Sequence, residues 1–139
     1  MADTGYNWDA AWAAVQKSAA DWTADDLTDT STEVSDAISL DGYAVMEFSI
    51  TVVEDNTGAI DGNVIVTLLG DCDGANYEEV DQGNPYEFEF LPKQNDTVRV
   101  RFRVLGCDYS SLKISIENDA GQTLSVTVKQ RGAKIPLAS

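Results

Sequence analysis

Apolar and charged side chains alternate along residues Thr97 to Leu105. The even-numbered positions carry valine or phenylalanine, and the odd-numbered positions between them carry Arg99, Arg101 and Arg103. Successive side chains of a β-strand point to opposite faces, whereas helical spacing would scatter both sets around a cylinder. The pattern therefore predicts a strand with one buried face and a row of arginines on the other face.

The same two-residue period recurs in segments that are separated by turn residues. We expect strands at residues 37–40, 43–54, 63–69, 77–80, 86–90, 97–105, 112–117 and 123–129. About eight short strands at such spacing are typical of an antiparallel β-sandwich. We therefore predict a mainly β protein with a single sandwich of the jelly-roll or immunoglobulin-like type. A chain of 139 residues is long enough to bury its core.

The N-terminal segment has a different period. Apolar side chains recur there at helical steps of three and four residues, at Trp8, Trp12, Val15, Ala19 and Trp22. This spacing predicts an amphipathic helix over residues 6–22, which several alanines favour. Its apolar stripe either docks on the β-domain or anchors the arm on a partner protein. For the second role the candidates are Trp8, Trp12, Val15 and Trp22.

Residues 23–35 are rich in Ser, Thr and Asp and poor in apolar side chains. This composition predicts a flexible or extended linker between the helix and the strands. We therefore divide the chain into an N-terminal helix, or arm, with its acidic linker (residues 1–35) and a β-sandwich domain (residues 36–139).

The charge of the chain is strongly unbalanced. It has 24 acidic and 9 basic residues, a net charge of −15, and Lys17 is the only base in residues 1–61. Such a surface repels phosphates and anionic lipids, so we expect no nucleic acid and no membrane as partner. The first residues lack the basic start and apolar run of a signal peptide. We therefore expect synthesis in the cytoplasm.

Residues 86–90 also alternate, with Glu87 and Glu89 on one face. If this strand pairs with residues 97–105, the two glutamates face the arginines. Each opposed pair would then contribute about 0.2–1 kcal/mol and set the register. In the alternative interpretation, Arg99, Arg101 and Arg103 stay free and form a docking face for an acidic partner.

Side chains with evident catalytic chemistry are scarce. The chain has no histidine, which removes the commonest general base and a common metal ligand. Adjacent acids such as Glu78 and Glu79 would suit glycoside hydrolysis, but 24 acids make such pairs frequent, and we interpret them as solvated faces. We expect no catalytic residue, no cofactor and a protein that is not an enzyme.

Two further groups of residues are candidates for chemistry. Asp71 and Asp73 lie in a Gly-bearing loop that is similar to a calcium loop, although turns favour Asp and Gly for their own reasons. The two cysteines, Cys72 and Cys107, each follow a Leu-Gly at a predicted strand end. They either form a disulfide or stay as two thiols, and cytoplasmic synthesis favours the thiols.

Several runs resemble small structural proteins of tailed bacteriophages: residues 35–44, 69–71, 95–99 and 117–121, together with Tyr109. The plan of an arm without a signal peptide followed by one β-sandwich is also similar to capsid decoration (cement) proteins and small tail or fibre proteins. The resemblance implies a non-enzymatic virion protein that decorates or stabilises the capsid by binding across shell subunits. It further implies virion proteins as partners, a homo-oligomer and a location in the virion. It assigns no individual residue.

A carbohydrate-binding or adhesive β-sandwich is the alternative function. Modules of that class usually carry aromatic side chains on the surface, and Tyr43, Tyr77, Tyr86 and Tyr109 are the candidates.

Overall fold

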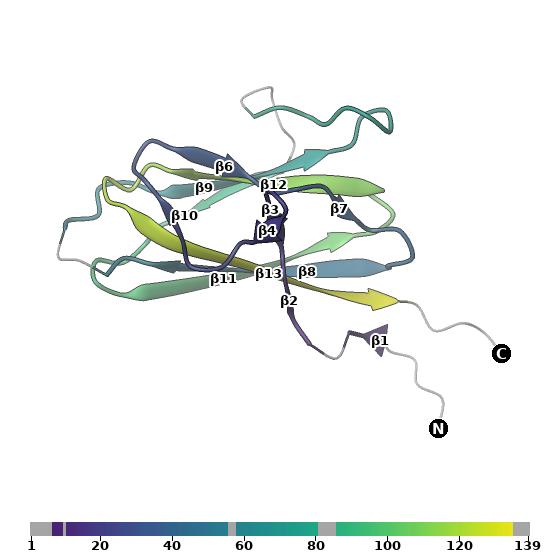
Figure 1. Ribbon diagram of the computed structural model, residues 1–139, viewed down its shortest axis with the longest axis horizontal. Coiled ribbons are helices and arrows are strands. Elements are labelled where there is room, and N and C mark those ends of the chain that lie inside the picture. The colour runs from purple at the N-terminus through teal and green to yellow at the C-terminus, as the bar shows by residue number, and fades with distance from the viewer. Residues whose placement is uncertain (1–6, 10, 56–57, 81–85, 135–139) are drawn as a thin grey trace.

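The computed structural model describes residues 7–9, 11–55, 58–80 and 86–134, and all regular structure in these ranges is β-strand (Figure 1). The predicted mainly β class is therefore confirmed. The described residues contain no helix, and hence no helix long and apolar enough to cross a membrane.

One antiparallel sheet is centred on β8 (Val45–Val53) and β13 (Leu124–Lys134). Strand β11 (Thr97–Leu105) pairs with β8 on one side, and β13 pairs with it on the other. The far edge of β13 receives three short N-terminal strands: β1 (Asn7–Trp8), β2 (Ala13–Ala14) and β5 (Asp25–Leu27). We call this the β8 sheet.

The second antiparallel sheet has the order β10 (Glu87–Phe90), β9 (Val64–Gly70), β12 (Ser111–Asn118). The free edge of β12 pairs with β6 (Thr32–Val34) and with β7 (Ile38–Ser39). A separate hairpin is formed by β3 (Gln16–Lys17) and β4 (Ala20–Asp21).

The two sheets form two layers in Figure 1, and their buried side chains belong to one hydrophobic cluster. Phe48 and Ile50 from β8 and Ile114 and Ile116 from β12 are all fully buried. Each such side chain contributes roughly 1.5–3 kcal/mol when it leaves water. Five long strands confirm the prediction from the alternating sequence. They are β8, β9, β11, β12 and β13, which match the strands predicted at residues 43–54, 63–69, 97–105, 112–117 and 123–129.

The helix predicted for residues 6–22 is wrong. Ser18 and Ala19 have positive φ angles of 52° and 59°, which close the β3–β4 hairpin and which a helix does not allow. The Asp36 carboxylate accepts hydrogen bonds from both of their backbone N–H groups, at 3.0 and 2.8 Å. In the extended chain, Trp22 is buried in the core. This tertiary contact outweighs the helical propensity of the segment, because a short helix is only marginally stable on its own.

The segment predicted as a linker contributes paired strands. Strand β5 adds to the β8 sheet and β6 adds to the second sheet. Between these two strands the chain crosses from one sheet to the other, and Leu27 enters the core with 1% exposure. Lys17, from the β3–β4 hairpin, forms ion pairs with Asp25 and Glu33. The polar composition of residues 23–35 therefore gave no indication of these two edge strands. Leu27 and the ion pairs of Lys17 hold them in place.

The predicted pairing of residues 86–90 with residues 97–105 is also wrong. Strand β10 pairs with β9, and β11 pairs with β8, so the two strands lie in different sheets. They meet across the core instead, where the rings of Phe88 and Phe102 are 5.1 Å apart. In addition, residues 77–80 form no strand beyond an isolated bridge between Asp71 and Tyr77.

Candidate functional site

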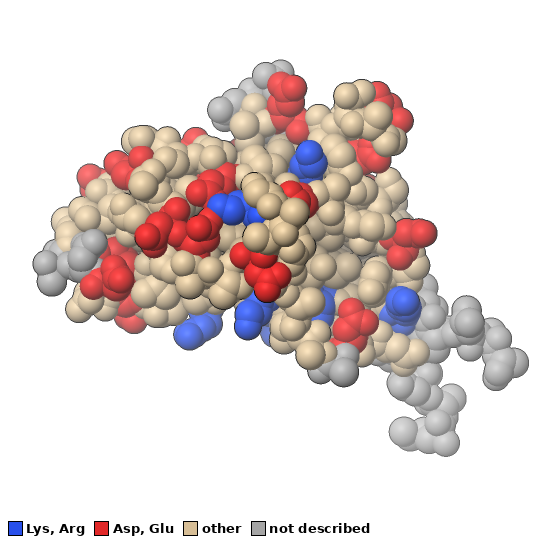
Figure 2. Space-filling model, in the orientation of Figure 1, with Lys and Arg blue, Asp and Glu red and all other residues tan. Residues whose placement is uncertain are grey.

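The outer face of the β8 sheet gathers basic side chains. Five of the nine basic residues alternate outward from β11 and β13, at Arg99, Arg101, Arg103, Lys129 and Arg131. In Figure 2 most of the visible basic side chains lie along the lower edge, the side of β8, β11 and β13 in Figure 1, whereas most of the charged side chains elsewhere in that view are acidic. We call these five residues, with the outward side chains of β8 between them, the basic face.

Strand register arranges this face in rows across β11, β8 and β13. The rows are Arg103–Glu47–Arg131, Arg101–Ser49–Lys129 and Arg99–Thr51–Thr127. Directly opposed side chains of neighbouring antiparallel strands lie about 4.5–5.5 Å apart at Cβ. Each row therefore places a residue of β8 between two residues of the flanking strands.

Glu47 is the acid at the centre of the first row. Its side chain has 0% exposure, although it points to the outside of the sheet. It accepts hydrogen bonds from Arg103 Nε at 2.8 Å and from Arg131 Nε at 3.1 Å, and Arg101 Nε lies 3.8 Å away. Burial opposes ionisation, but these hydrogen bonds and charges outweigh it and hold the pKa of Glu47 below its ordinary value. Glu47 therefore takes the role that the sequence suggested for Glu87 and Glu89.

Two tryptophans of the N-terminal segment lie against the same arginines. The Arg131 guanidinium is 4.8 Å from the ring centroid of Trp8 and 4.7 Å from that of Trp12. Arg103 lies 5.2 Å from the Trp8 ring. Cation–π contacts of this length contribute about 0.5–2 kcal/mol each. These contacts hold the N-terminal segment against the basic face.

The four candidate anchor residues therefore fall into two groups. Val15 and Trp22 are core residues, each with 1% exposure, and have no surface to offer a partner in this structure. Trp8 and Trp12 remain partly exposed and contact the protein's own arginines. The exposed Glu87 and Glu89 lie on β10 in the other sheet, so they are not part of the basic face.

A hollow of about 390 Å³ lies beside Trp12 on the basic face. Its lining consists of Trp12, Ser49, Thr51, Arg99, Thr127 and Lys129. Within the described part of the chain, neither Arg99 nor Lys129 forms an ion pair. The hollow thus combines an aromatic side chain, three hydroxyl-bearing side chains and two cations that have no carboxylate partner among the described residues. We call it the Trp12 hollow.

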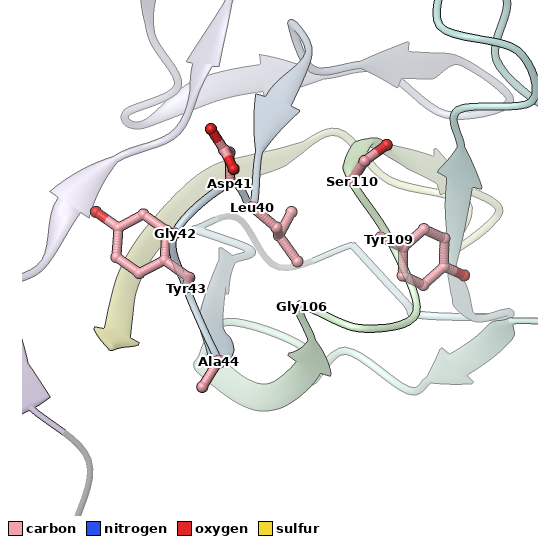
Figure 3. A pocket seen from close by; sticks show the side chains of 8 residues that line it. All are labelled: Leu40, Asp41, Gly42, Tyr43, Ala44, Gly106, Tyr109 and Ser110. Carbon is pink, nitrogen blue, oxygen red and sulfur yellow. The ribbon is translucent and has the colours of Figure 1, made fainter. Parts of the chain in front are cut away.

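A second hollow, of about 470 Å³, lies between the loop that joins β7 to β8 and the loop that joins β11 to β12. Figure 3 shows Tyr43 and Tyr109 on either side of Leu40, with both hydroxyl groups directed away from it. The Tyr109 hydroxyl is buried without a hydrogen-bond partner among the described residues. Burial, with the charge of Glu78 as a smaller cause, raises the pKa of Tyr109 to about 12.

The other two candidate tyrosines come to the same end of the molecule. The rings of Tyr86 and Tyr109 are 5.8 Å apart, and the Tyr77 hydroxyl lies 2.6 Å from Ser111 Oγ at the start of β12. Tyr109 thus packs against Tyr86 and shares a hollow with Tyr43, although the three are distant in the sequence.

The Asp71–Asp73 loop uses its carboxylates internally. Asp71 Oδ1 accepts from the N–H groups of Asp73 and Gly74, and Asp73 Oδ1 accepts from those of Ala75 and Asn76. These hydrogen bonds lower the pKa of Asp73, and they account for its presence in a turn. No cluster of three or more acids or cysteines in the described ranges could hold a metal ion.

Both cysteines are exposed and free, so the disulfide alternative is not realised between Cys72 and Cys107 in this structure. Their two loops do lie at the tyrosine-bearing end, but the side chains are not bonded.

Sequence reasoning found the arginines of β11 and missed Glu47, Lys129 and Arg131. Part of the signal was available, because apolar and polar side chains alternate over residues 124–129, although Gln130 interrupts the pattern before Arg131. What the sequence could not show is that β8 separates β11 from β13 and sets these residues side by side. Comparison of the chain with protein-family models and with curated proteins gave no match.

Proposed function

We propose that this protein is a non-enzymatic attachment protein that holds an acidic macromolecule on the basic face. The observation that carries the proposal is the concentration of five basic residues on one sheet face of a protein with a net charge of −15. Opposite charge on such a face selects the partner and orients it, while the acidic remainder of the surface keeps other anions away.

We propose further that the two layered sheets are a β-sandwich of the jelly-roll or immunoglobulin-like type. Support comes from the single buried cluster that both sheets share. A sandwich is a rigid support for a binding face, because its strands are fixed by two neighbours and by the core. The arrangement of Trp8 and Trp12 on Arg131 stiffens the face from outside.

The setting we propose is the exterior of a phage particle. In that setting a virion structural protein would decorate the capsid by placing the basic face on an acidic patch that spans shell subunits. A small tail or fibre protein would use the same face on an acidic surface outside the particle. Support for this setting is the resemblance of the sequence runs to small proteins of tailed bacteriophages, together with the basic face.

The attachment proposal is tested with two acidic polymers, poly-glutamate and polygalacturonate, in an equilibrium binding assay. The variant R99Q/K129Q removes two cations and leaves the contacts of Glu47 intact. The control K93Q/K113Q removes the same charge elsewhere on the protein. We expect binding of at least one polymer by the wild type and by the control, and a loss of about tenfold in R99Q/K129Q. Equal binding by both variants contradicts the proposal.

The virion setting is tested separately by mass spectrometry of particles purified from a lysate of a strain that carries the gene. We expect the chain at high copy number relative to a tail protein, and a lower copy number for R99Q/K129Q. Particles that lack the chain contradict this setting without affecting the attachment proposal.

A further inference from the structure

The Trp12 hollow is lined by more kinds of side chain than attachment to an acidic surface requires. Two cations would be sufficient to attract carboxylates, yet the lining adds an indole ring and three hydroxyl groups. We propose that this hollow binds one uronic-acid residue of an acidic polysaccharide. The inference rests on the proposed attachment function and names the class of its ligand.

The carboxylate of the sugar has two cations to meet. Arg99 comes from β11 and Lys129 from β13, on either side of β8. Two strand spacings separate these flanking strands, or about 10 Å, and both side chains line the hollow. A guanidinium binds a carboxylate through two N–H groups, and the ammonium group adds a second charged hydrogen bond.

The floor of the hollow supplies hydroxyl groups for the hydroxyls of the sugar. Ser49 and Thr51 alternate outward from β8 at adjacent rows, and Thr127 pairs with Thr51 across the sheet. Thr127 Oγ1 already accepts a hydrogen bond from Ala24 N at 2.8 Å, so its own O–H is free to donate to a ligand. Hydroxyl side chains both donate and accept, as do those of a saccharide.

Trp12 forms the wall against which the ring of the sugar packs. An indole presents a large apolar face with little conformational entropy to lose, which suits the C–H face of a pyranose. The Arg131 guanidinium 4.7 Å from its ring centroid holds the indole in place before the ligand arrives. Binding therefore does not have to order this side chain.

Alternative ligands leave part of the hollow unused. An aspartate or glutamate of a protein partner would pair with Arg99 and Lys129 but would leave Trp12 without a ring to pack on. A neutral sugar would leave both cations unpaired. Two acids on the outer face of the same sheet do not line the hollow: Glu47 is enclosed by its own arginines, and Asp26 is opposite Ser125 in the strand register, one row beyond Thr127. Charge and ring chemistry together fit a uronate.

The test measures calorimetric binding of oligogalacturonate and oligoglucuronate to the folded chain. Two further probes are a carboxyl-reduced oligogalacturonate and an oligo-glutamate with the same number of carboxylates. We expect a uronate to bind, with both of these probes weaker by about tenfold or more. We expect W12A and R99Q/K129Q each to lose about tenfold, and K93Q/K113Q to bind as the wild type does.

T51V keeps the shape of the floor and removes one hydroxyl, so it tests the site even where W12A disturbs the N-terminal segment. We expect a loss of about three- to tenfold for the uronate and no change for oligo-glutamate. If oligo-glutamate binds as well as the uronates and neither W12A nor T51V has an effect, the uronate site is wrong and the attachment proposal stands. If no acidic probe binds, both are wrong.

Discussion

The guanidinium of Arg131 lies 3.0 Å from the carboxylate of Glu47, which is completely buried on the outside of a sheet. An outward side chain of a two-layered protein is ordinarily in contact with water. Glu47 is covered because arginines of β11 and β13 close over it from both sides, and because Trp8 and Trp12 pack against those arginines. One carboxylate thereby joins three strands and the N-terminal segment.

Replacing Glu47 by glutamine should lower the free energy of unfolding at pH 7 by about 2 kcal/mol, since it removes charged hydrogen bonds to arginine. The pKa of Glu47 is below its ordinary value of 4.5, so its contribution is complete above that pH and is lost as the pH falls through the lowered value. Urea denaturation of wild type and E47Q at pH 7 and about pH 3 measures this.

The difference in unfolding free energy between wild type and E47Q should narrow on acidification. E89Q, at an exposed position of β10, is the control and should change stability by less than about 0.5 kcal/mol. A difference that stays constant between the two pH values would show that the ionised carboxylate of Glu47 does not contribute.

A glycine at position 19 should stabilise the protein. Ala19 has a φ of 59°, a region that costs an ordinary residue roughly 1 kcal/mol and that glycine adopts freely. We expect A19G to raise the unfolding free energy by about 0.5–1 kcal/mol, as measured by chemical denaturation. A14G, in strand β2, should lower it by a similar amount because glycine weakens a strand. A destabilised A19G would contradict the hairpin that the structure places here.

Gly106 should not tolerate alanine. A Cβ at this position would overlap with the carbonyl oxygen of Tyr43, a backbone atom that cannot move aside. We expect G106A to lower the unfolding free energy by about 2 kcal/mol or more through strain at the end of β11. G42A is the matched comparison, because Gly42 has space around it and only an unfavourable φ of 80°. It should cost about 1 kcal/mol. Equal melting temperatures for the two variants would count against the close approach of the loops.

Tyr109 should ionise at a higher pH than an ordinary tyrosine, and its hydroxyl group should not be needed for stability. Its pKa of about 12 exceeds the ordinary value of 10, so the neutral form is favoured in the folded state. Stability from this group is therefore complete below pH 10 and declines as the pH rises from 10 to 12. Absorbance titration of tyrosine in wild type and Y109F should assign the last-titrating group to Tyr109.

At pH 7 we expect Y109F to be as stable as the wild type or slightly more stable, because the buried hydroxyl has no partner among the described residues. A loss of more than about 1 kcal/mol would reveal a hydrogen bond that this structure does not contain.

The long strands could be predicted from the sequence because their information is local. Strands β8, β9, β11, β12 and β13 each direct one face into the shared core, and such a face requires apolar side chains at every second position. The same alternation predicted the outward arginines of β11. The basic face as a whole could not be predicted, since β13 is separated from β11 by β12 in the sequence and by β8 in the sheet.

The N-terminal segment shows the opposite case. Trp8, Trp12, Val15 and Trp22 have helical spacing, yet two of them are in the core and two contact arginines of the basic face. The positions of these four side chains in the fold depend on Glu47, on the arginines and on the open edge of β13, all of which are far from the N-terminal segment in the sequence. Tertiary contacts outweigh a helical preference that amounts to a few tenths of a kcal/mol per residue.

By itself, then, the sequence determined the segments that form the long strands, the inward residues of those strands and the absence of histidine chemistry, because each follows from residue type or from a period of two. Only the tertiary structure decided which strands are neighbours, that Glu47 is buried by Arg103 and Arg131, and that Arg99 and Lys129 flank one hollow. Strand pairing joins residues far apart along the chain, and the energies that select one pairing over another are sums over the whole core rather than properties of any segment.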